Sequence, residues 1–150
     1  LNYMCNNTLI NFIDLPPCIE SIQLYDGFDK TLDYLPNTIK KIVFNSNINT
    51  KLSNLPSSVK YVSFYRMKLT DICKIYELPD SVETIYLDLI YFVSINLTYL
   101  PKKIKLIQIE KSNVAYKIIN HINAYKKLNN LNFAIELAEH SLTRSLTHLL

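Results

Sequence analysis

Apolar residues recur along most of the chain with a period of twenty-odd residues. The dipeptide Leu-Pro occurs five times, at spacings of 20, 20, 23 and 22 residues. Further apolar residues stand three positions before each of these leucines and four, seven and nine positions after it. A fixed period of this length indicates stacked repeats, in which each unit buries its apolar face against its neighbours. The five leucines, numbered position 0 of each unit below, are Leu15, Leu35, Leu55, Leu78 and Leu100.

The offsets within a unit predict one short strand and one extended connection. Apolar residues at +7 and +9, with other residues between them, have the period of a strand with one buried face. The proline at +1 has no N–H and favours an extended residue before it, so it belongs to the connection. The predicted core columns are Ile19, Ile39, Val59, Val82 and Ile104 at +4, Ile22, Ile42, Val62, Ile85 and Ile107 at +7, and Leu24, Phe44, Phe64, Leu87 and Ile109 at +9.

These units predict an α/β repeat solenoid of right-handed, leucine-rich-repeat-like form. Five units over residues 12–115 would build a short parallel β ladder, at about 4.8 Å per strand, with extended return arms. Residues 1–11 are predicted to be a flank, either a partial cap or the helical tail of a preceding domain. From residue 116 to residue 150 the apolar spacing changes to three and four, which is typical of amphipathic helices. We expect two helices there, separated near Asn129, Asn130 and Asn132, which cap the last apolar edge.

Residues 55–64 and 78–87, which read LPSSVKYVSF and LPDSVETIYL, resemble the FNIP repeat most closely. This leucine-rich-repeat-like family is abundant in amoebae and in the giant viruses that infect them. Its Phe-Asn step survives here only as Phe28-Asp29 and Ile48-Asn49. The resemblance implies the leucine-rich-repeat-like fold. Some members carry an F-box. An F-box before Leu1 would make this chain the substrate-binding part of a ubiquitin-ligase adaptor. Because the chain begins with Leu1 rather than Met, we expect upstream sequence.

Composition and charge exclude several classes of function. The chain is 49% hydrophobic and 19% charged, which fits one compact domain. Its single glycine, Gly27, leaves no room for a glycine-rich phosphate loop or a nucleophile elbow, so we expect no enzyme, no catalytic residue and no cofactor. A net charge of +3 with scattered lysines does not favour nucleic acid. No apolar run approaches the roughly 20 residues of a membrane span.

Cysteines and histidines give no strong signal of chemistry. The three cysteines Cys5, Cys18 and Cys73 are odd in number and far apart, which favours reduced thiols in a cytoplasmic protein. Cys18 stands at +3, where we interpret it as a tolerated small residue of a turn. Glu136 and His140 could share a helix face, but no third ligand stands at a fixed spacing, so no metal site is expected. We expect the histidines His121, His140 and His148 to be solvated helix residues.

The surface opposite the predicted core is the candidate functional site. Residues at +6, +8 and +10 point away from the core and should form three exposed columns. A central cluster of Lys41, Tyr61, Tyr65, Tyr86 and Asp88 is predicted to bind a protein, since tyrosine is enriched in binding hot spots. The alternative is that these tyrosines are ordinary strand residues. A charge introduced at the outward position Ser63 is expected to be tolerated.

Two functions follow from these observations. The first is a non-catalytic interaction module whose strand-lined face recognises a protein or peptide. The alternative is a structural or self-assembling scaffold, for example a viral component, which pairs through the open ends of the solenoid.

Overall fold

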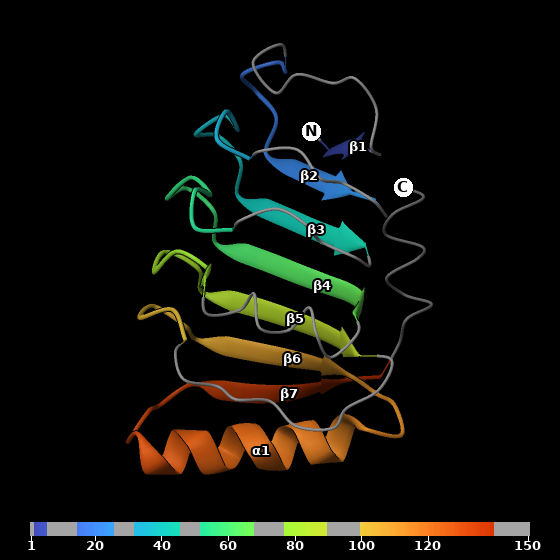
Figure 1. Cartoon of the computed structure of the whole chain (residues 1–150), viewed down its shortest axis with the longest axis vertical. Coiled ribbons are helices and arrows are strands. Elements are labelled where there is room, and N and C mark those ends of the chain that lie inside the picture. Colours follow the sequence, from blue (N-terminus) through green and yellow to red (C-terminus); the bar gives the residue numbers. More distant parts are fainter. Residues whose placement is uncertain are drawn as a thin grey trace.

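All the strands belong to one parallel sheet. The structure is a computed structural model and describes residues 2–5, 15–25, 32–45, 52–67, 77–89 and 100–139. Within these ranges seven strands lie side by side in chain order, and every neighbouring pair is parallel. Figure 1 shows them as a ladder, with the helix beyond its last strands. The elements are β1 (Asn2–Cys5), β2 (Ser21–Leu24), β3 (Lys41–Asn45), β4 (Tyr61–Met67), β5 (Thr84–Leu89), β6 (Leu106–Glu110), α1 (Ala115–Leu128) and β7 (Ala134–Ala138).

The register places equivalent positions of successive units side by side. Ile42 lies opposite Ile22 on one side and opposite Val62 on the other, and Ile85 lies opposite Val62 and Ile107. The predicted columns at +7 and +9 are therefore confirmed, and every member is at most 2% exposed. In the +9 column the rings of Phe44 and Phe64 stack with centroids 5.7 Å apart. The chain thus has a repeat-like α/β fold with one continuous core.

A turn closes each arm, and a hydroxyl group joins the second, third and fourth arms to the one before. The backbone N–H at +4 donates to the carbonyl of the +1 proline, as from Val59 to Pro56 at 3.1 Å. The side chain at +3 donates to the +4 carbonyl of the preceding unit: Ser58 Oγ lies 2.7 Å from the Ile39 oxygen and Ser81 Oγ lies 3.0 Å from the Val59 oxygen. In the second, third and fourth units position +3 therefore forms a structural hydroxyl ladder, whereas Cys18 at +3 of the first unit is an exposed free thiol.

Removing one hydroxyl from this ladder should destabilise the fold measurably. Ser81 is only 9% exposed, so Ser81→Ala leaves a buried carbonyl without its donor and should cost about 1 to 2 kcal/mol of unfolding free energy. Ser81→Thr keeps a hydroxyl, as Thr38 does at the same position with a 2.7 Å bond to Ile19, and should cost less. Urea unfolding of both variants measures the difference. Equal losses would show that the hydroxyl contributes nothing.

The first residues of the chain form a strand. β1 pairs with β2 in the register Asn2↔Ser21 to Cys5↔Leu24, the positions +6 to +9 of a further unit. The expectation of a helical tail is wrong for residues 2–5, because the exposed edge of β2 offers hydrogen-bonding groups that an added strand satisfies. The remainder of the predicted flank 1–11 lies outside the described residues.

The expected helix at residue 116 is confirmed and ends where the asparagines begin. α1 buries Ala115, Ile118 and Ile122 against the core. At its end Asn130 has φ 51°, and Leu131 N–H donates to the Lys126 carbonyl at 3.0 Å. A left-handed residue followed by this bond is the Schellman end of a helix, and asparagine is one of the few residues that tolerate it.

The second expected helix is wrong for the described residues that follow α1. Residues Ala134–Ala138 form β7, which pairs with β6 from Leu106↔Ala134 to Glu110↔Ala138. Their apolar residues Ile135 and Leu137 fit a strand as well as a helix, and the open edge of β6 decides for the strand. The region 116–150 is therefore a helix followed by a strand as far as residue 139, and the residues after it lie outside the described part of the chain.

Candidate functional site

The candidate surface lies on the side of the sheet opposite the core, which we call the outward face. It consists of the side chains at +6, +8 and +10. Four of the five predicted site residues are half-buried there, on β3, β4 and β5: Lys41, Tyr61, Tyr65 and Asp88. Lys41 lies directly opposite Tyr61 at the start of the strands, whereas Tyr65 and Asp88 lie toward their ends. The outward face therefore carries two small groups, four residues apart along β4.

The middle column between these groups is buried, contrary to expectation. Val43, Ser63 and Tyr86 are 2%, 0% and 4% exposed. Ser63 has a tyrosine two positions away on each side, and Val43 and Tyr86 are its partners in the adjacent strands, so larger neighbours cover a small side chain. The expectation that Ser63 tolerates a charge is wrong, because an aspartate there would be buried.

Tyr86 was predicted to be an exposed member of the cluster, and this is wrong. Its hydroxyl donates to a carboxylate oxygen of Glu110, a residue that is itself only 8% exposed. A buried tyrosine hydroxyl normally needs such a partner, and a hydrogen bond to a charged acceptor is stronger than a neutral one. Tyr86 therefore joins β5 to β6 beneath the outward face and does not present its ring to a partner.

Cations lie over both half-buried tyrosine rings. Lys41 Nζ is 4.8 Å from the ring centre of Tyr61, and the guanidinium carbon of Arg66 is 5.7 Å from that of Tyr65. Each contact contributes on the order of 0.5 to 1 kcal/mol at a partly exposed site. The tyrosines are thus held in place, and the two groups on the outward face each combine an aromatic ring with a positive charge.

A β-bulge shapes the second group. The pairing of β4 with β5 shifts between Phe64↔Leu87 and Met67↔Leu89, so Tyr65 and Arg66 together stand opposite Asp88. Arg66 has φ 54°, a left-handed conformation that costs a non-glycine residue roughly 1 to 2 kcal/mol. Such bulges reorient side chains next to functional sites. The sequence reasoning missed Arg66; the only signal was the 23-residue spacing of this unit, three longer than the one before it.

One buried amide beside this group has no partner among the residues described. Asn45, which lies opposite Tyr65 in the ladder, has its Nδ2 atom buried without a hydrogen-bond acceptor there. An unpaired buried donor costs about 1 to 3 kcal/mol. The strained Arg66 and this amide make the end of the outward face near Tyr65 less favourable to stability than the rest of the sheet.

Charged residues at +5 form exposed pairs along the starts of the strands. Lys40 binds Glu20 at 2.8 Å and Lys105 binds Glu83 at 3.1 Å, each between neighbouring units. The hydrogen bond from Lys40 lowers the pKa of Glu20, and the hydrogen bond from Lys105 lowers the pKa of Glu83. A carboxyl group acting as a general acid near neutral pH needs a raised pKa, so these pairs do not fit that role.

Residues with metal or thiol chemistry lie apart in the described ranges. No group of three histidine, cysteine or carboxylate residues close enough to hold a metal occurs among them. Glu136 lies on β7 rather than on a helix, and His140 and His148 lie outside the described residues. His121 lies on α1, and Cys18 has an exposed free thiol. In the same ranges, no helix is long and apolar enough to cross a membrane.

The parallel ladder and its repeated arms define the class as a repeat protein with an α/β fold. The family model described as FNIP Repeat matches residues 28–66. The chain therefore carries an FNIP repeat at residues 28–66, and the resemblance inferred from its Leu-Pro units is confirmed over that range, which includes β3 and all of β4 except Met67. No curated protein and no solved structure gives a significant match to the chain.

Proposed function

We propose that this chain is a non-catalytic protein-interaction module, an FNIP-repeat solenoid that recognises a protein or peptide with its outward face. The observation that carries the proposal is the group of Tyr65, Arg66 and Asp88 at the bulge. Tyrosine and arginine are the residue types most enriched in binding hot spots. Here both residues are held on a rigid sheet. The left-handed backbone at Arg66 lowers the stability of the fold, and a role in binding would explain why it is present.

The proposed binding surface comprises Lys41, Tyr61, Tyr65, Arg66 and Asp88. Tyr86 supports this surface indirectly, since its hydrogen bond to Glu110 joins β5 to β6. A rigid surface of this kind loses little conformational entropy on binding. The FNIP repeat favours the same class of function, as a repeat type associated with protein interaction rather than with catalysis. The finer role of F-box-type adaptor requires an F-box before Leu1, and the gene sequence upstream tests it.

The experiment compares affinity capture from the native cell with matched tyrosine variants as baits. Tyr61→Ser with Tyr65→Ser should remove most captured partners, because truncating hot-spot residues costs about 2 kcal/mol or more each. The control is Tyr34→Ser with Tyr116→Ser, which removes two tyrosines that are 59% and 65% exposed and lie off the outward face. Circular dichroism confirms that both baits are folded. Equal capture by the two double variants would contradict the proposal.

Arg66→Gly adds a readout that a purely structural role would not give. Glycine adopts φ 54° without a Cβ penalty, and this gain offsets the lost contact with the Tyr65 ring, so the variant should be close to the natural chain in stability. If Arg66 contacts the partner, the same variant should bind more weakly. A variant that is both less stable and unchanged in binding would assign Arg66 to the fold alone.

A structural or self-assembling role is the second candidate, and the two ends of the sheet favour it. β1 and β7 each pair with one neighbour only among the described strands. Strand edges of this kind can pair with another copy. Sedimentation across a concentration series distinguishes the two functions: a monomer throughout would count against self-assembly.

A further inference from the structure

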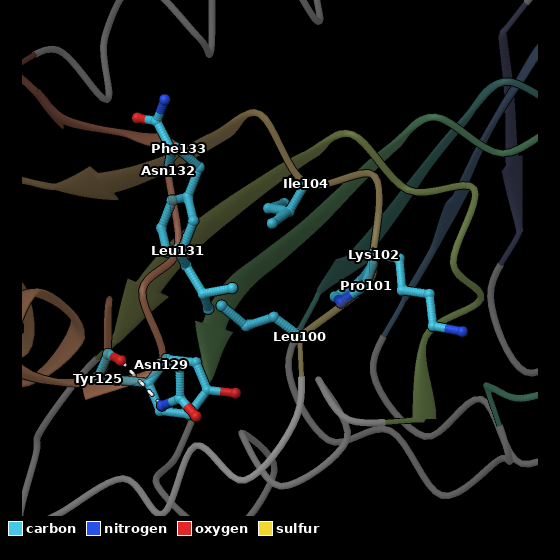
Figure 2. Close-up of a pocket in the computed structure, with 9 residues that line it drawn as sticks. All are labelled: Leu100, Pro101, Lys102, Ile104, Tyr125, Asn129, Leu131, Asn132 and Phe133. Carbon is cyan, nitrogen blue, oxygen red and sulfur yellow. Dashed lines mark hydrogen bonds between the residues drawn. The ribbon is translucent and has the colours of Figure 1, made fainter. Parts of the chain in front are cut away.

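A pocket opens at the end of the ladder, away from the outward face. It has a volume of about 390 Å³ and lies between the last Leu-Pro arm and the segment that links α1 to β7. Figure 2 shows the side chains of Leu100 and Leu131 approaching one another across it, with Ile104 behind them and Tyr125 at one side. Phe133 forms part of its wall. The lining is therefore mostly apolar.

The pocket exists because the repeat is broken at this point. In the first four units the +4 residue is an aliphatic side chain with no exposed surface, whereas Ile104 in the fifth unit is only half-buried. The ladder register places Asn132 at +4 of the next unit, and Asn132 is exposed. Phe133 turns inward in its place and is 5% exposed. The +4 column thus lacks its next aliphatic side chain. The pocket lies where that side chain would be, and its lining is mostly apolar.

Two lysines, Lys102 and Lys126, lie at the pocket, in a part of the chain with an excess of positive charge. Residues 100–139 contain seven lysines and three glutamates, and one of these glutamates, Glu110, is buried against Tyr86. Lys102 lines the pocket, and Lys126 lies with its ammonium 4.8 Å from the ring centre of Phe133. The ion pair of Lys102 with Asp80 spans 3.7 Å, with side chains 79% and 42% exposed, so it contributes little and can be exchanged.

We propose that this pocket docks one aliphatic side chain of an acidic peptide segment. The aliphatic group enters beside Ile104 and Leu131, where it continues the +4 column, and carboxylates flanking it in the peptide meet Lys102 and Lys126. The volume is at the lower end of the range for ligand sites, roughly 300 to 1,000 Å³, which suits a side chain better than a large cofactor. This surface is separate from the outward face, so the inference does not depend on the proposed function.

The test uses the full chain and a fluorescein-labelled peptide, Glu-Asp-Ser-Leu-Ser-Asp-Glu, with binding followed by fluorescence anisotropy. Exchanging the peptide's leucine for serine should weaken binding at least about tenfold, the loss expected when an anchor side chain is removed. Replacing its acidic residues by lysine should have a similar effect. Raising the salt concentration should weaken the binding of the original acidic peptide, because salt screens the attraction between charges at an exposed rim.

Matched protein variants separate the pocket from its surroundings. Leu131→Asn should weaken peptide binding about tenfold. The control Leu128→Asn removes a leucine that is 85% exposed and does not line the pocket, so it should leave binding unchanged. Lys102→Glu should weaken binding about threefold, and Lys111→Glu, the same charge change on an exposed lysine outside the pocket, should not. Ile104→Phe puts a larger side chain where the aliphatic group would enter, without exposing polar groups, and should weaken binding even if Leu131→Asn perturbs the helix end.

Several results would overturn the proposal. These are equal binding of the leucine and serine peptides, no binding at peptide concentrations up to about 1 mM, and equal losses from Leu131→Asn and Leu128→Asn. Self-association of the chain that Ile104→Phe abolishes would assign the pocket to a second copy instead. Binding to anionic lipid vesicles that depends on Leu128 as much as on Leu131 would assign this end of the molecule to a membrane surface.

Discussion

Replacing Ile85 by aspartate should unfold the protein at room temperature. Ile85 has no exposed surface and lies at the centre of the +7 column, between Val62 and Ile107. A carboxylate there would lose its hydration without gaining a partner, and the isoleucine's own burial would be lost as well. We expect a loss of more than about 5 kcal/mol, which is the whole stability of a domain at the lower end of the usual range of roughly 5 to 15 kcal/mol. Thermal denaturation followed by circular dichroism measures it.

Thr84→Asp is the matched control for this prediction. Thr84 is the neighbour of Ile85 in β5, points to the other face and is half-buried, so its aspartate keeps access to water. The loss there should be about 1 kcal/mol or less. Ser63→Asp should resemble Ile85→Asp more than Thr84→Asp, because Ser63 is fully buried although it points outward. If Ile85→Asp and Thr84→Asp lower the melting temperature equally, the assignment of the two faces is wrong.

The core could be predicted from the sequence because stacking of the units requires apolar residues at the same positions in every unit. Stacked units bring identical offsets into contact, so a fixed set of apolar positions recurs and the register follows from alignment of the Leu-Pro steps. Val62, for example, lies opposite Ile42 and Ile85 as the common offset +7 requires. The hydroxyl ladder at +3 was visible as a run of threonine and serine, but its role required the distance from each hydroxyl to the preceding carbonyl.

Exposure on the outward face could not be predicted from offsets alone. The offset fixes the direction of Tyr86, but its burial depends on the size of its neighbours and on the hydrogen bond to Glu110, two strand positions further along the next strand. The bulge at Arg66 is also a local choice, since one additional residue within a strand leaves the apolar offsets of that unit unchanged. These are the features on which the proposed binding surface depends.

The end of the repeat array is the other place where the sequence pattern was insufficient. Leu131, Ile135 and Ala138 follow at helical spacing, while Ile135 and Leu137 follow at strand spacing, and five residues cannot decide between the two periods. The edge of β6 decides, because its backbone groups are satisfied by a parallel strand and not by a helix. Secondary structure at the end of a stack is therefore set by the neighbouring unit more than by local sequence.

Removing residues 116–150 should convert the protein into an aggregating species. The deletion takes away Ile118 and Ile122, which α1 packs against the core, and the whole of β7. β6 would become an edge strand, with Ile107 and Ile109 of the core columns at an unprotected end. Open edges with apolar side chains pair with other chains, and repeat arrays depend on their terminal units for solubility. Light scattering of the purified truncated chain should rise with concentration and time.

A second, smaller change separates edge protection from the loss of apolar area. Glu136→Pro within β7 removes an N–H that faces β6, since Ala134 two positions earlier donates to the Lys105 carbonyl at 2.9 Å, and it leaves α1 in place. We expect partial destabilisation by roughly 1 to 3 kcal/mol, the cost of a carbonyl of β6 left without its donor. Aggregation should be slower than in the truncated chain, because the helix still covers part of the core. If the truncated chain remained monomeric and folded, α1 and β7 would be an independent addition to the repeats. If Glu136→Pro aggregated as fast as the truncated chain, protection would come from the strand edge alone and the apolar face of α1 would contribute nothing to solubility.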